Sequence, residues 1–331
     1  MVKPTQRVVG RGERVVSGVW RLRLPLPWPG VPHCNAWAIA AGDGVVLVDT
    51  GAHEPGSMGH LERALDQVGL RVEHVRLIVC THAHADHCGQ AATIAARAGC
   101  EVWMHPRSDH LFKSAEDPDA VLARRLEIAR QSGVPAEPLQ RWVEARKGQG
   151  PLVAFPLEIA RELVPGVEVQ TDLGTFSVLE TPGHAPSHVS LHQPDRRLLL
   201  SGDHLLGRVS LYFDVGWSPD PVAEFLESLD RVDVLDARLA LSGHGRPFTD
   251  VRGHVNANRA LVAEQLDKVR AVLRTESLSA FDIAPRVFGD SFGAATGAWL
   301  FTETMAFLTH LEALGEARRV EGEPERWALA A

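Results

Sequence analysis

The chain has 331 residues, of which 45% are hydrophobic and 23% are charged, as is typical of a soluble globular protein. Its formal net charge of −8 gives it no electrostatic reason to bind nucleic acid or an anionic membrane. The N-terminal residues lack the apolar core of a signal peptide, and no later run approaches a membrane span. We therefore expect a cytoplasmic protein with no membrane partner, whose four cysteines are reduced thiols.

The first hundred residues alternate strand-like and helix-like segments. Residues 36–51 predict a hairpin around the turn AGDG, and residues 57–68 carry apolar side chains at helical spacing. Residues 75–81 form a continuous apolar run rich in β-branched residues, which is typical of a buried strand. This predicted strand leads directly into His82-Ala-His-Ala-Asp-His87, and residues 89–99 then predict a helix.

The remaining chain suggests a helical insertion and a separate C-terminal module. Residues 106–165 read as a helical insertion, which either caps the site or forms a peripheral pair or dimer surface. Strands resume after it, and three predicted helices with two short strands follow residue 250. We therefore expect a catalytic domain over residues 1–250 and a small winged-helix-like module over residues 251–331.

Seven side chains of metal-ligand type follow predicted strands. Four of them fall within six residues: His82, His84, Asp86 and His87. Imidazole and carboxylate groups are ligands that Zn²⁺ and similar ions prefer, and four of them are too many for one catalytic ion and too few for two. Three more candidates follow apolar strands in glycine-containing turns: His184, Asp203 and His244.

Each of the later candidates also has a purely structural interpretation. His184 and Asp203 could cap turns, and His244 could pack beneath the aspartate. These interpretations weaken when the residues are taken together, because a buried apolar strand leads into the histidine cluster and further strands deliver the other candidates. The pattern therefore favours one metal site assembled from several strand ends.

The combined pattern resembles the metallo-β-lactamase superfamily, in the branch of glyoxalase II and of β-lactamase-like protein 2. The resemblance covers about residues 15–250 and rests on VLVDTG with Asp49, H-x-H-x-D-H at 82–87, TPGH with His184, SGD with Asp203 and SGHG with His244. It implies an α+β four-layer αββα sandwich, with two facing sheets and helices outside. By this resemblance His82, His84 and His184 hold one ion, Asp86, His87 and His244 hold a second, and Asp203 bridges both. Asp49 would orient the site.

The resemblance implies a metal-dependent hydrolase. Two divalent ions, Zn²⁺ above all with iron or manganese as alternatives, would generate a bridging hydroxide that attacks an ester, thioester or lactone of a small organic substrate. Asp86 and Asp203 are the predicted catalytic residues, and Asp86 could also accept the proton of the nucleophile. Tyr212 and His204 are weaker candidates for substrate contacts, since Tyr212 could simply pack and His204 could face away from the metals.

Other functions remain open on the same fold. A metal-dependent endoribonuclease or phosphodiesterase would be expected to carry a basic surface, but residues 251–331 contain nine Lys and Arg against eleven Asp and Glu. An iron-dependent oxidoreductase would use the same ligand types. A non-catalytic binding protein would have no need of a complete ligand set. We expect a small-molecule substrate, and a C-terminal module that either packs beside the site or mediates a homodimer.

Overall fold

The computed structural model describes the chain except for residues 1–8, 29, 145–149, 151, 295 and 331. Its first sheet follows the chain order from β1 to β7. The strands are β1 (Arg11–Val16), β2 (Val19–Trp28), β3 (Val31–Ala41), β4 (Gly44–Val48), β5 (Val75–Val79), β6 (Glu101–Met104) and β7 (Arg161–Glu162). Pairing is antiparallel from β1 to β4 and parallel from β4 to β7.

The second sheet has the order β12-β11-β10-β9-β8. Its strands are β8 (Glu168–Thr171), β9 (Gly174–Glu180), β10 (Val189–Gln193), β11 (Leu198–Gly202) and β12 (Leu239–Ser242). Strands β8 to β11 pair antiparallel, whereas β11 and β12 are parallel. Strands β9, β11 and β12 therefore end at the same edge of this sheet.

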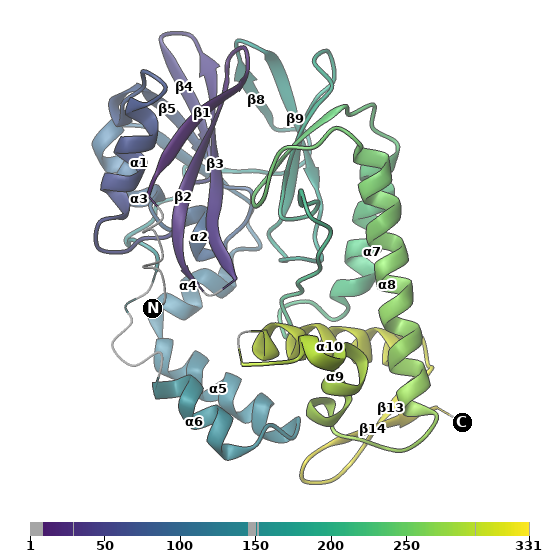
Figure 1. Ribbon diagram of the computed structural model, residues 1–331. Coiled ribbons are helices and arrows are strands. Elements are labelled where there is room, and N and C mark those ends of the chain that lie inside the picture. Colours follow the sequence, from purple (N-terminus) through teal and green to yellow (C-terminus); the bar gives the residue numbers. More distant parts are fainter. Residues whose placement is uncertain (1–8, 29, 145–149, 151, 295, 331) are drawn as a thin grey trace, which may run out of the picture.

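Helices cover the outer faces of both sheets (Figure 1). Those of the first 250 residues are α1 (Ser57–Asp66), η1 (Val72–His74), α2 (Ala85–Cys88), α3 (Ala91–Ala98), α4 (Asp109–Glu116), α5 (Pro118–Gln131), α6 (Ala136–Glu144) and α7 (Pro221–Asp233). Within the described residues, no helix combines the length and the apolar character that a membrane crossing requires. All four cysteines lie in described positions and are unpaired.

The two-residue period of the strands divides their side chains between two cores. On β4, Val46 and Val48 pack between the sheets, while Val45 and Leu47 pack beneath α1 and α3. Each such side chain contributes roughly 1.5–3 kcal/mol when it is fully buried. A third core joins the outer face of the second sheet to α7. These layers form the predicted αββα sandwich, which is confirmed.

The segment predicted as a helical insertion is only partly helical. Residues 106–144 contain α4, α5 and α6, but Arg161–Glu162 form β7 and extend the first sheet beside β6. Leu157 and Leu163 are buried against the sandwich. The last part of the predicted insertion therefore belongs to the sheet, because its apolar residues complete the sandwich instead of forming a helical face.

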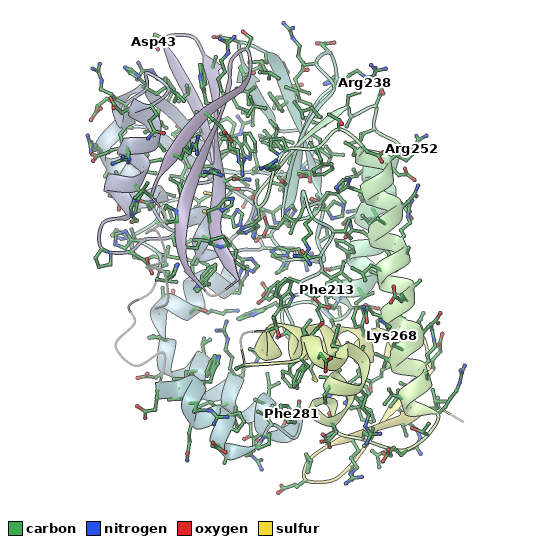
Figure 2. All side chains as sticks on the ribbon, in the orientation of Figure 1. Asp43, Phe213, Arg238, Arg252, Lys268 and Phe281 are labelled. Atoms are coloured by element: carbon green, nitrogen blue, oxygen red, sulfur yellow. The ribbon has the colours of Figure 1, made fainter. Side chains whose placement is uncertain are left out.

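The last eighty residues form helices and a hairpin, as the sequence suggests. The elements are α8 (Val251–Leu273), α9 (Ala280–Phe288), η2 (Gly289–Ser291), α10 (Gly297–Ala313), β13 (Ala317–Val320) and β14 (Arg326–Leu329). They share one hydrophobic core with α7, and Phe213 lies between the second sheet and α10, with its ring 5.9 Å from Phe307 (Figure 2). A winged-helix arrangement of these elements and a boundary at residue 250 stay predictions.

The end of α5 is hydrogen-bonded to the C-terminal elements. The amide of Phe281, at the start of α9, donates to the carbonyl of Ser132 at 3.0 Å (Figure 2). The amide of Glu325, in the final hairpin, donates to the carbonyl of Gln131 at 2.8 Å. Segments that are far apart in sequence thus meet below the ends of the sheets (Figure 1).

Glu303 on α10 gives a testable pH dependence of stability. Burial raises the pKa of this carboxyl to about 8, against an opposing hydrogen bond from Trp299. Between about pH 4.5 and 8 the folded chain holds a proton that the unfolded chain has lost, so stability falls as pH rises. We expect Glu303→Gln to remove a slope of up to about 1.4 kcal/mol per pH unit, measured by urea unfolding at pH 6 and pH 8.

Glu312→Gln is the matched control on the same helix, because Glu312 is more exposed and pairs with Arg319. It should leave the pH slope of the wild-type chain unchanged. Equal slopes for the wild type and Glu303→Gln would contradict the assignment of a buried, protonated carboxyl.

Candidate metal centre

The predicted ligands meet because their strands end at one edge of the sandwich. The parallel strands β4 and β5 deliver Asp49 and His82 from the first sheet. Strands β9, β11 and β12 deliver His184, Asp203 and His244 from the second. Strands that run in the same direction place their carboxyl ends together, so residues distant in sequence become neighbours.

Three histidines form the first cluster. His82 Nε2 lies 2.9 Å from His84 Nδ1, and His184 Nε2 lies 3.0 Å from the same atom. One ring nitrogen from each of the three can reach a common ion. Only Ala83 separates His82 from His84, and the helical turn α2 follows directly. This arrangement places the two rings on one side of the site.

A second cluster contains Asp86, His87 and His244. His244 Nε2 lies 3.2 Å from Asp86 Oδ2 and 3.2 Å from Asp203 Oδ2. Asp203 lies between the two clusters: its Oδ1 is 3.5 Å from His87 Nε2, and its Oδ2 is 3.7 Å from His184 Nε2. The structure thus brings all seven predicted ligands close together.

Asp49 holds His87 in one orientation. Its Oδ2 lies 2.8 Å from His87 Nδ1, and its carboxylate also accepts hydrogen bonds from the backbone and hydroxyl of Thr81. A carboxylate only accepts, so Nδ1 carries a hydrogen and Nε2 faces the cluster. Asp49 has a backbone φ of 63°, a left-handed conformation that turns the chain at the end of β4.

Two other histidines are oriented in the same way. His244 Nδ1 lies 3.0 Å from the carbonyl oxygen of His33, which fixes its Nε2 toward the carboxylates. His84 Nε2 lies 2.7 Å from Asp214 Oδ2, which turns its Nδ1 toward the first cluster. In each case an acceptor outside the cluster takes the ring hydrogen and leaves the other nitrogen free to bind a cation.

The electrostatics keep Asp203 and His184 in metal-binding protonation states, whereas the charge of Asp203 raises the pKa of His87 and of His244 against the effect of burial, so these two rings would release a proton when an ion binds. Although burial raises the pKa of Asp203, the charges of His244 and His87 hold it well below its usual range. Burial and the charge of His84 lower the pKa of His184 to about 4. An ionised carboxylate and a neutral imidazole are the forms that ligate metals.

Two buried atoms support the fit of a cation at this position. In the part of the chain that the structure describes, His87 Nε2 and Asp203 Oδ1 are buried without a hydrogen-bond partner. Leaving a buried polar group unsatisfied costs roughly 1–3 kcal/mol. An ion between these atoms would satisfy both, so the donor set fits a divalent metal.

Three residues of the site were not predicted from the sequence. Asp214 orients His84, as described above. His188 Nε2 accepts a hydrogen bond from the backbone amide of Asp203 at 3.0 Å, and Thr181 Oγ1 contacts its Nδ1 at 2.8 Å. His110 of α4 lies with its ring 6.2 Å from that of His84. His188 lies in the segment TPGHAPSH, four residues after His184, so the sequence could have indicated it as a site residue. No motif of this kind surrounds Asp214 or His110.

The two weaker candidates occupy different environments. The ring of Tyr212 lies 5.9 Å from His84 and 5.4 Å from His184, at the edge of the first cluster. His204 is buried, with its ring 5.0 Å from Phe225, and belongs to neither cluster. Burial lowers the pKa of His204 to about 3, so its ring is neutral. Tyr212 therefore lies beside the first cluster, whereas His204 lies outside both clusters.

Asp214→Asn tests the contact with His84. Loss of the carboxylate removes the acceptor that orients the ring, and we expect the metal affinity to fall by about 10–100-fold. The measurement is competition with a chromogenic chelator. Glu180→Gln is a matched control, because Glu180 accepts a similar contact of 3.1 Å from His105 outside the clusters. Unchanged affinity in Asp214→Asn would contradict the role of this carboxylate.

The fold and the clustered ligands define the class of this protein. The model of the metallo-beta-lactamase superfamily matches residues 29–244. The chain therefore belongs to this superfamily of hydrolytic enzymes, and its His and Asp clusters are compatible with a divalent metal site.

Individual relatives extend the match to most of the chain. The probable metallo-hydrolase YqjP of Bacillus subtilis is 25% identical over 297 residues, which cover 86% of this chain and 87% of the relative. The hydroxyacylglutathione hydrolase GloC of Haemophilus influenzae is 25% identical over 203 residues, 58% of this chain and 78% of the relative. The crystal structure of a beta-lactamase domain protein from Burkholderia ambifaria is 28% identical, with a TM-score of 0.84 over 99% of this chain and 97% of that one.

Proposed function

We propose that the chain is a dinuclear metal-dependent hydrolase that cleaves an ester, thioester or lactone of a small organic substrate. The observation that carries the proposal is the position of Asp203 between the clusters: its Oδ1 lies 3.5 Å from His87 Nε2, and its Oδ2 lies 3.2 Å from His244 Nε2 and 3.7 Å from His184 Nε2. His82, His84 and His184 would hold one ion, Asp86, His87 and His244 the other, and Asp203 both. Zn²⁺ suits this ligand set best, and iron or manganese are alternatives.

Bound divalent ions supply Lewis acidity: they lower the pKa of water to about 7 and polarise the bond under attack. The chain's own residues prepare for that chemistry. Asp49, Asp214 and the His33 carbonyl each bind one ring nitrogen of an imidazole and so turn the other nitrogen toward the cluster. Asp86 stays ionised, because His87 and His244 lower its pKa against the effect of burial, and an ionised carboxylate is the form that binds a metal.

Tyr212 adds a polar contact at the rim of the site. Burial and the charge of Asp214 raise the pKa of its hydroxyl, which therefore remains protonated. A protonated phenol can donate a hydrogen bond to a substrate carbonyl and orient it toward the clusters. The relative from Haemophilus influenzae bears the name of a hydrolase acting on hydroxyacylglutathione, which supports an acyl substrate here.

A nuclease is less well supported. Residues 251–331 carry more acidic than basic side chains, and the whole chain has a net charge of −8. Contacts with a phosphate backbone depend on Lys and Arg, so an acidic chain would bind RNA weakly. An acyl hydrolase needs no such surface.

The proposal is tested with purified full-length protein. Metal analysis should find two ions per chain. A panel of acyl thioesters, esters, lactones, phosphodiesters and RNA should show hydrolysis of an acyl substrate, which a chelator abolishes and Zn²⁺ restores. Activity that persists at full strength after the ions are removed would contradict the metal-dependent mechanism, and cleavage of RNA alone would favour the nuclease.

A further inference from the structure

A tryptophan with two basic side chains lies next to the metal centre. The ring of Trp217 is 5.7 Å from that of His110, whose ring is 6.2 Å from His84. Lys113 of α4 and Arg124 of α5 both lie over the Trp217 ring, at 5.8 and 5.6 Å from its centroid. Such cation–π contacts hold basic groups in place without neutralising their charge.

Two adjacent arginines of α5 have no acidic partner among the described residues, and one of them, Arg124, faces this tryptophan. Arg124 contacts only the Trp217 ring and, at 3.5 Å, the carbonyl of Gly216 within the described residues. Arg125 makes no ion pair with any described residue. Arg130, further along the same helix, pairs with Glu127 at 2.9 Å. Helix α5 thus leaves two positive charges uncompensated on its part nearest the site.

Arg125 lies within electrostatic reach of Tyr212, at the edge of the metal centre. The ring of Tyr212 lies 5.4 Å from that of His184, so the positive field of α5 extends to the edge of the first cluster. Asp214 does not cancel it by pairing with the arginines, because its carboxylate is engaged by His84.

We propose that the substrate of the metal centre carries an anionic group, a carboxylate or a phosphate, which Arg124 and Arg125 hold beside Trp217. The inference rests on the proposed function and narrows its substrate class to anionic esters or thioesters. Guanidinium groups bind carboxylate and phosphate oxygens through paired, charge-assisted hydrogen bonds. Because the chain has a net charge of −8, its overall field repels anions. An anionic substrate would therefore need local basic groups to bind.

The test measures binding to the full-length protein by calorimetry. The probes are non-hydrolysable thioether analogues of equal length that end in a neutral amide, a carboxylate or a phosphate. We expect an anionic analogue to bind the wild type about tenfold more tightly than the amide, with a preference that weakens in high salt. The double variant R124Q/R125Q should lose this preference. R130Q, which removes a charge already paired on the same helix, should retain it.

The outcomes separate this inference from the function on which it rests. Equal affinities for the three analogues, or a preference that survives in R124Q/R125Q, would overturn the arginine site. The stronger of the carboxylate and phosphate analogues identifies the anion. Turnover of the matching thioesters is scored separately: if none is cleaved, thioester hydrolysis fails, while the binding comparison still decides the role of the arginines.

Discussion

Replacing Asp203 with alanine is expected to reduce substrate turnover by about 10³-fold or more and to lower the bound metal below two ions per chain. The reason is geometric, since one carboxylate oxygen lies 3.5 Å from His87 Nε2 and the other 3.2 Å from His244 Nε2 and 3.7 Å from His184 Nε2. Alanine removes the group between the two clusters and leaves their remaining members apart. The measurements are metal content by mass spectrometry and steady-state kinetics.

Asp43→Ala serves as the control for Asp203→Ala, because Asp43 is a surface carboxylate that pairs with the exposed Arg76. It should keep the metal content and turnover of the wild type. Circular dichroism should show the native fold in both variants. A variant at Asp203 that retains two ions and full activity would contradict the dinuclear proposal.

Gly243→Ala is expected to lower turnover by about 10²-fold, although it adds a single methyl group. A Cβ at this position would lie 2.1 Å from Asp203 Oδ1 and 2.7 Å from His87 Cε1. The methyl group must therefore displace two predicted ligands. The backbone of Gly243 is not in the left-handed region, so the loss would report crowding of the site and not backbone strain.

The control for this variant is Gly59→Ala, since a Cβ on Gly59 of α1 would meet no atom within 4 Å. It should preserve turnover and metal content. Gly243→Ala should bind metal more weakly than the wild type in the chelator competition. Wild-type kinetics in Gly243→Ala would show that Asp203 and His87 can move to admit the methyl group without loss of activity. That result would contradict the expected crowding.

The seven ligands could be predicted from sequence because each follows an apolar strand. Parallel strands place their carboxyl ends at one edge, so this order brings Asp203 and His244 together on the second sheet, and the packing of the two sheets adds His82 of the first. The layers were implied by the family resemblance, and the structure gives their physical basis, since successive side chains of β4 pack into two different cores. Regular elements carry their geometry in local spacing, which a single sequence displays.

The loop after β11 could not be predicted in the same way. Asp214 reaches His84 because Leu211 and Phe213, on the same loop, are buried in the core that α7 and the C-terminal helices share. No period in residues 205–220 encodes that packing. The strand β7 was missed for a related reason: a pair of exposed residues carries no strand signal, and its place depends on β6.

The hydrogen bonds from Phe281 and Glu325 to the end of α5 constrain how such chains can be divided or recombined. A truncated protein ending near residue 250 would lose the partners of Ser132 and Gln131 and would uncover the apolar side of α7. A chimaera that takes residues 106–144 from another family member would need the matching C-terminal helices from the same source. The two segments form one exchangeable unit, even though the catalytic strands separate them in sequence.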